Sequence, residues 1–289
     1  MPNDQLRFQS HPQLVNSTLI MGFTGWMDGG DVSTGTIERL ITELGAREFA
    51  EIEPDGFYIY SFPGSMEVSA LFRPHTKIKD GLVESFAPSR NTFFFDPKNQ
   101  IVLFQGKEPN VRWSDYVDCI FTLASEVDAK QIFFVGSVGG LVPHTRAPRL
   151  FCTVSSPELI PAMQDYGMRL TNYEGPGSII SYLLSEAGRR GLPMSSVIAE
   201  IPPYVEGRNI RCIESVIRQM AGILNLKINL DDLRTTGDEL EKKLNEIVEQ
   251  RPVLAKHIRK LEEDYDNEVF DSQMGDLKAW LEQQGIQLD

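Results

Sequence analysis

Short apolar runs that alternate with helix-patterned segments most constrain the fold of this chain. Strands covered by helices on both faces have such nearly continuous apolar runs, whereas strands with one face in water alternate apolar and polar residues. The clearest candidate strands are residues 17–23, 57–62, 100–106, 131–137 and 195–202, and weaker candidates are residues 91–96 and 150–156.

The segments between these runs carry the helical period. Residues 31–46 form one apolar stripe, for which Asp31 is the expected N-cap and Gly45 the expected end. Further helices are expected over 113–129 with Ser114 as N-cap, over 175–191 with Pro176 in the first turn and Gly191 at the end, and over 210–225. The alternation predicts an α/β fold with a mostly parallel central sheet covered by helices.

Two regions depart from this alternation. Residues 63–90 are too long for a routine connection, and they predict either an insertion with short strands of its own or a flap. Residues 1–234 are therefore expected to form the α/β core domain, and residues 235–289 a helical C-terminal extension. Pro252 predicts two helices joined near residues 250–252, and residues 272–285 predict a short third helix. An apolar heptad spacing in this extension comprises Leu240, Leu244, Ile247, Leu254, Ile258, Leu261 and Tyr265.

Composition excludes several classes of function. The 289 residues carry a net charge of −13, which argues against nucleic-acid and anionic-membrane partners, because both require a basic surface. No apolar run is long enough to span a membrane, so a cytoplasmic protein is expected. The three cysteines and four histidines are scattered, so neither a disulfide framework, a metal site nor a cofactor is expected.

The first candidate site is the loop GFTGWMDGGDV, residues 22–32, which contains Trp26, Asp28, Gly29 and Gly30. A glycine-rich loop between a strand and a helix suits an anion, but this spacing matches no nucleotide-binding motif. Asp28 and Asp31 also place negative charge where a phosphate would lie. The pattern favours a structural turn or a recognition surface.

Two further loops contain candidate site residues. His144 and Arg146 follow the strand at 131–137 and could serve as proton donor and anion clamp. The alternative is an extended loop whose His and Arg pair with neighbouring groups. Gly177 and Ser178 open the helix over 175–191, where an anion could bind. Ser178 lies in no GxSxG motif, and helix capping is its expected role.

The sequence resembles the proteasome assembly chaperone 2 family, in its bacterial branch. The resemblance rests on GWMDGGDVSTGTIERLITELGA at 25–46, GGLVPHTRAP at 139–148, residues 173–209 and LDDLR at 230–234, in the family's order. It implies an α/β fold akin to nucleoside phosphorylases and hydrolases. Eukaryotic members help to build the proteasome's α-ring, and prokaryotic relatives look oligomeric. The family supplies no catalytic residues to carry over, and the ending GIQLD does not match its hydrophobic-tyrosine docking motif.

The leading hypothesis is a non-enzymatic, homo-oligomeric protein-interaction or assembly-chaperone-like module. Its partner would be a second copy of the chain, with a trimer as one option, or another protein complex. The alternative hypothesis is an enzyme or sensor that binds a small anionic ligand, such as a nucleoside or phosphate compound, where the three glycine-rich loops meet. A third hypothesis treats residues 235–289 as a partner-binding helical hairpin on a scaffold core.

Overall fold

The computed structural model describes residues 4–61, 63, 65–70 and 72–283. Among these, nine strands form one sheet whose four central strands are parallel. Strand β2 lies between β7 and β8, so that Leu19 is opposite Val102 on one side and Ile132 on the other. The central strands, in spatial order, are β7 (Ile101–Lys107), β2 (Ser17–Thr24), β8 (Ala129–Gly139) and β11 (Met194–Ile201).

Antiparallel strands extend the sheet at both edges. Beyond β7 lie β6 (Thr92–Asp96), β3 (Arg47–Ile52) and β1 (Leu6–Phe8), each antiparallel to its neighbour. Beyond β11 lie β9 (Leu150–Cys152), antiparallel to β11, and β10 (Arg169–Leu170), parallel to β9. The predicted mostly parallel sheet is therefore correct for the centre, and the edges are mixed.

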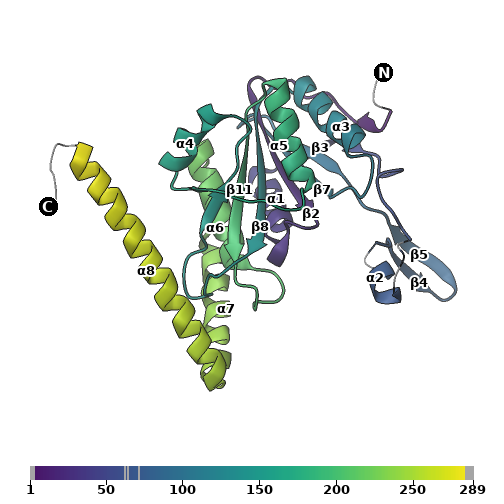
Figure 1. Cartoon of the computed structure of the whole chain (residues 1–289). Helices are drawn as coiled ribbons and strands as arrows, with labels where there is room; N and C mark the ends of the chain where they lie inside the picture. Colours follow the sequence, from purple (N-terminus) through teal and green to yellow (C-terminus); the bar gives the residue numbers. More distant parts are fainter. Residues whose placement is uncertain (1–3, 62, 64, 71, 284–289) are drawn as a thin grey trace.

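Helices cover both faces of the sheet (Figure 1). Helices α1 (Val32–Leu44) and α6 (Ile210–Leu224) pack on one face, and α3 (Trp113–Glu126) and α5 (Ile179–Arg190) pack on the other. Consecutive residues of β2 divide between the two cores: Leu19 packs with α3 and α5, and Ile20 packs with α1 and α6. Both faces are buried, which explains the continuous apolar runs. The short elements are η1 (Gly29–Asp31), η2 (Pro157–Leu159) and α4 (Ile160–Asp165).

The predicted strand over residues 57–62 is wrong for 57–61, and residue 62 lies outside the described residues. Phe57 is fully buried and Tyr58 nearly so, but they belong to a loop. The apolar run thus reflects burial rather than strand pairing. Strand β3 was not predicted, because charged residues interrupt it and its burial is only partial.

The predicted carboxyl ends of α1 and α5 are correct, whereas the predictions for Ser114 and Pro176 at the amino ends are wrong. Gly45 and Gly191 end α1 and α5 with φ of 60° and 66°, a left-handed conformation that favours glycine. Ser114 is not an N-cap, because α3 begins one residue earlier, at Trp113. Pro176 precedes α5, which begins at Ile179.

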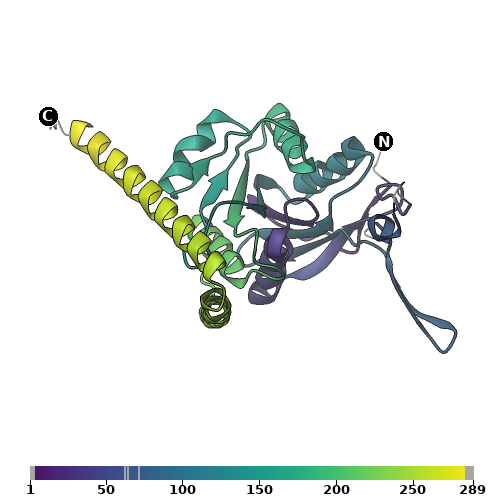
Figure 2. The ribbon, with the colours of Figure 1, turned by 60° about the horizontal axis from the view of Figure 1, so that its bottom comes forward.

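Residues 75–87 form a hairpin that stands away from the body in both views (Figures 1 and 2). It consists of β4 (His75–Lys79) and β5 (Leu82–Ala87), and the short helix α2 (Met66–Ala70) precedes it in the chain. Residues 63–90 thus contain two short strands of their own. We call the β4–β5 hairpin, residues 75–87, the arm.

The C-terminal extension is a pair of helices, α7 (Asp231–Glu249) and α8 (Pro252–Gln283). They are joined at residues 250–252, as the position of Pro252 led us to predict. Residues 272–283 do not form the separate third helix that was predicted, because α8 continues through them without interruption. Residues 284–289 lie outside the described residues. Of the heptad residues, Ile258 is buried and Ile247 is 47% exposed. No described helix combines the length and apolarity that a membrane span needs.

Candidate functional site

The loop after β2 is held by Asp28. Its Oδ1 accepts the Thr34 N–H at 3.0 Å, and its Oδ2 accepts the Thr34 hydroxyl at 2.8 Å, within the first turn of α1. Asp31 holds the predicted N-cap position of α1 but makes no side-chain cap bond, and Asp28 supplies that bond instead. Burial raises the pKa of Asp28 to about 6, although the two Thr34 bonds act in the opposite direction.

Gly29 and Gly30 allow this loop to pack closely on the sheet and on α6. The Gly29 carbonyl accepts the Ser137 hydroxyl at 2.7 Å, and the Gly30 carbonyl accepts the Asn209 N–H at 2.8 Å. Gly30 has φ of 63°, and a Cβ there would lie 2.7 Å from Asn209 Cβ. The glycines thus serve internal packing at the carboxyl ends of β2 and β8.

Glu108 joins the loop after β2 to the start of α5. Its Oε2 accepts the Trp26 N–H at 3.1 Å, and its Oε1 accepts the Ile179 N–H at 3.3 Å. Ser178 caps α5 as expected, because its hydroxyl accepts the Ser181 N–H at 3.3 Å. The helix start at Gly177 and Ser178, where an anion was a candidate ligand, therefore already contacts a carboxylate of the chain itself.

His144 is buried beneath the C-terminal extension. Its backbone N–H donates to the Tyr204 hydroxyl, which also lies 2.9 Å from Nδ1, and its Nε2 lies 3.2 Å from Asn245 Oδ1 on α7. A neutral ring that accepts the Tyr204 proton at Nδ1 and donates from Nε2 satisfies every contact. Burial lowers the pKa of His144 and so favours this neutral form.

Arg146 contacts α8. Its Nε and Nη2 donate to the two oxygens of Asp266, both at 2.8 Å, and its Nη1 lies 3.7 Å from Glu262. A bidentate carboxylate of the same chain thus occupies the guanidinium that could have served as an anion clamp. The geometry of His144 and Arg146 matches the alternative in which both pair with neighbouring groups.

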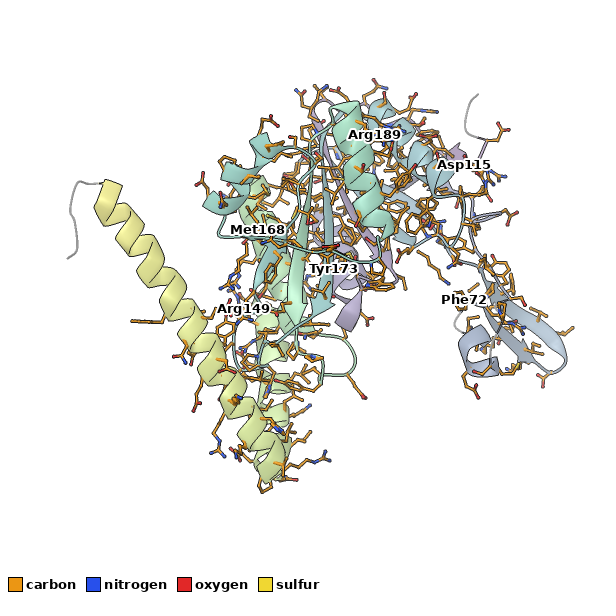
Figure 3. All side chains as sticks on the ribbon, viewed as in Figure 1. Phe72, Asp115, Arg149, Met168, Tyr173 and Arg189 are labelled. Atoms are coloured by element: carbon orange, nitrogen blue, oxygen red, sulfur yellow. The ribbon has the colours of Figure 1, made fainter. Side chains whose placement is uncertain are left out.

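The sequence did not point to Arg149, whose side chain connects the sheet to the C-terminal extension. Its guanidinium donates to Glu200 on β11 at 2.8 Å and to Glu268 on α8 at 2.6 Å, and it lies over the ring of Tyr265. Figure 3 shows Arg149 between the sheet and α8. No short motif marks these pairings, because their partners lie far apart in the chain.

The eight candidate residues divide into two groups. Trp26, Asp28, Gly29, Gly30, Gly177 and Ser178 belong to loops that meet at the carboxyl ends of β2 and β8, where the Ser178 hydroxyl lies 3.9 Å from the Met27 sulfur. His144 and Arg146 instead lie against α7 and α8. The cavity at His144 encloses about 30 Å³, and a wider hollow lined by Arg146 and Arg211 encloses about 370 Å³.

Three large apolar side chains on loops of the core are exposed. Trp26, after β2, and Leu141, after β8, are each 73% exposed, and Tyr173, between β10 and α5, is 66% exposed. Figure 3 labels Tyr173. Among the described residues, no group of three or more His, Cys, Asp or Glu side chains is arranged to hold a metal ion.

Comparison with solved structures shows the same fold in several bacterial proteins. A Mycobacterium tuberculosis protein of unknown function has a TM-score of 0.81 and 20% identity, over 96% of this chain and 93% of that one. A Corynebacterium glutamicum protein of unknown function has a TM-score of 0.78 and 20% identity, over 92% and 99%. A Mycobacterium tuberculosis proteasome-assembly chaperone homologue has a TM-score of 0.72 and 23% identity, over 83% and 99%.

A search of curated proteins found no match. The model of the PAC2 family matches residues 22–248, which include most of the core, the arm and most of α7. This match covers well over half of the sequence, and the resemblance inferred from the motifs is confirmed. The chain belongs to the PAC2 family.

Proposed function

We propose that this protein is a non-enzymatic, homo-oligomeric protein-interaction module that acts in the manner of an assembly chaperone. The observation that carries the proposal is that the chain's own groups already occupy the places expected to bind a ligand. In an open α/β sheet, ligands bind at the carboxyl ends of the strands. Here Glu108 contacts the start of α5, and Asp28 caps α1.

The second group of candidate residues supports the same reading. His144 is bound by Tyr204 and Asn245, and Arg146 is bound by Asp266. A base or an anion clamp needs a free face toward a substrate, and these contacts use the polar atoms of both side chains. A small anionic ligand, the alternative hypothesis, is therefore not favoured.

Three exposed apolar side chains support contact with another protein. Trp26, Leu141 and Tyr173 are large apolar residues that lie in solvent on loops of the core. Exposed aromatic side chains of this kind are enriched at protein interfaces. One structural neighbour is described as a proteasome-assembly chaperone homologue, which supports an assembly role for this chain without naming its client. A cytoplasmic location stays a prediction from the sequence.

Two measurements test the proposal together. Light scattering after size exclusion should give a mass at least twice that of one chain, which is 32.6 kDa. Thermal-shift screening with nucleosides, nucleotides and inorganic phosphate should leave the melting temperature unchanged. A monomeric mass would contradict the homo-oligomer. A ligand-induced shift that His144→Ala or Arg146→Ala abolishes would instead support the small-ligand hypothesis.

A further inference from the structure

Helix α8 contains two apolar stripes, and they lie on different sides of the helix. The inner stripe comprises Leu254, Ile258, Leu261 and Tyr265, and the distal stripe comprises Phe270, Met274, Leu277 and Leu281. Both stripes have successive spacings of four, three and four residues, which keeps the members of each on one side of a helix. The distal stripe begins sixteen residues after the inner one, so it is rotated by about 160° around the helix axis.

The inner stripe faces the chain's own body. Ile258 is buried, and Leu254 and Leu261 are half-buried where α8 packs against α7. The Tyr265 hydroxyl donates to the carbonyl of Ala147 in the core at 2.9 Å. The inner stripe therefore accounts for the packing of α8 within one molecule.

The distal stripe lies on the other side of the helix. Its first residue, Phe270, is 62% exposed. Glu268, which pairs with Arg149 and Arg169 of the core, is only two residues earlier and thus lies on nearly the opposite side of α8. Figures 1 and 2 both show the C-terminal half of α8 extending beyond the body. The body of the same chain is therefore not placed to cover this stripe.

The spacing of the distal stripe is that of a helix that pairs with another helix. Apolar residues at alternating intervals of three and four form the seam of a coiled coil. Asp271 and Lys278 each follow a stripe residue by one position, which is where charged residues flank such a seam. They are seven residues apart and opposite in charge, so the segment is complementary to a second copy of itself that runs in the reverse direction.

We propose that α8 of one copy pairs antiparallel with α8 of a second copy through the distal stripe. This inference rests on the proposed homo-oligomer and names one of its contacts. Phe270 lies level with Leu281 of the second copy, and Met274 with Leu277. Asp271 then lies about 3 Å along the axis from Lys278 of the second copy, and this pairing occurs twice. The contact is isologous, because both copies use the same surface, so it joins copies in pairs.

A parallel pair of α8 helices is a poorer fit. It would align each residue with its own counterpart, which leaves Asp271 about 10 Å along the axis from Lys278 of the second copy. It would also place two bodies at the same end of the pair. In the antiparallel pair the bodies lie at opposite ends, because each α8 extends beyond its own body (Figures 1 and 2).

Aspartate substitutions in the distal stripe test the contact. Phe270→Asp and Leu277→Asp each place a charge in the seam, and sedimentation equilibrium should give half the wild-type mass for both, because an isologous contact joins copies in pairs. Val253→Asp is the matched control and should keep the wild-type mass, since Val253 is an α8 residue outside both stripes and is 72% exposed. Circular dichroism and thermal melting of each variant separate loss of fold from loss of assembly.

Charge exchange tests the antiparallel arrangement. Asp271→Lys alone brings lysines together, and Lys278→Asp alone brings aspartates together, so each variant should associate about tenfold more weakly than the wild type. An equal mixture of the two restores both opposite-charge pairs and should associate about as tightly as the wild type.

Two results would overturn the inference while leaving the homo-oligomer intact. One is a folded Phe270→Asp or Leu277→Asp that keeps the wild-type mass, and the other is a mixture that associates no better than either charge variant alone. A wild-type mass of 32.6 kDa would instead refute the proposed homo-oligomer itself, and the α8 contact with it.

Discussion

The guanidinium carbon of Arg149 lies 4.4 Å from the centre of the Tyr265 ring. This stacking joins the segment between β8 and β9 to α8, and the same guanidinium donates to Glu200 on β11. One buried cation thus connects the sheet, the loop that contains His144 and the C-terminal extension.

Replacing Arg149 by methionine should destabilise the protein. The Arg149 and Glu200 side chains are only 8% and 13% exposed, so Arg149→Met leaves the Glu200 carboxylate nearly buried without its cation. We expect the free energy of unfolding to fall by about 3 kcal/mol in urea denaturation. Arg189→Met is the control, because Arg189 is 75% exposed and its ion pair should contribute less than about 0.5 kcal/mol. Equal effects of the two substitutions would contradict this role.

Asp28 should make the protein less stable as the pH rises from 4 to 6. Burial raises the pKa of Asp28 from 3.8 to about 6, so the folded chain holds this proton between those values while the unfolded chain has lost it. The stabilisation is complete below pH 3.8 and is lost as the pH passes 6. After allowance for partial solvent exposure, the loss is on the order of 1–2 kcal/mol.

Asp28→Asn isolates this contribution, because the amide can keep both contacts to Thr34 and does not titrate. At pH 7 the variant should unfold at higher urea concentration than the wild type, and below about pH 4 the difference should vanish. A variant that is less stable than the wild type by the same amount at every pH would contradict the assignment.

Glu108 should be the group that keeps anions away from the start of α5. Glu108→Ala removes the carboxylate that accepts the Ile179 N–H. In this variant, sulfate or phosphate should raise the melting temperature, because the anion can bind the freed N–H groups. The wild type should show no such shift. Glu43→Ala controls for general salt effects, since its ion pair with Arg39 lies on α1. Identical anion responses of wild type and Glu108→Ala would count against this interpretation.

His144 should destabilise the folded chain in mild acid. Burial lowers its pKa below 6.5, so below that pH the unfolded chain binds the proton more readily than the folded chain. Stability therefore falls as the pH drops through 6.5, opposite in sign to the effect of Asp28. The stability difference between wild type and His144→Gln should be smaller at pH 5 than at pH 7. A difference that does not change with pH would show that His144 does not titrate in this way.

The sequence predicts the centre of this fold well, because the central strands are apolar on both faces. It fails at the edge, where β3 contains charged residues and pairs in an antiparallel ladder. It also took the apolar residues Phe57 and Tyr58 for a strand, although they are buried within a loop. A run of apolar residues reports burial, and only the tertiary structure decides which backbone pairs.

The candidate site shows the same limit. The sequence identified Ser178 as a helix cap, because capping depends on neighbouring residues. It did not identify Glu108, whose partners Trp26 and Ile179 lie 82 and 71 residues away. The sequence also did not show that His144 contacts α7 and Arg146 contacts α8. Loops that follow neighbouring strands of one sheet can pack against different elements, and the sequence does not specify which.

The mass of the wild-type protein in solution tests the central claim most directly. Sedimentation equilibrium over a range of concentrations reports the number of associated chains. The account predicts a wild-type mass of two or more times 32.6 kDa. A wild-type mass of 32.6 kDa at every concentration would contradict it.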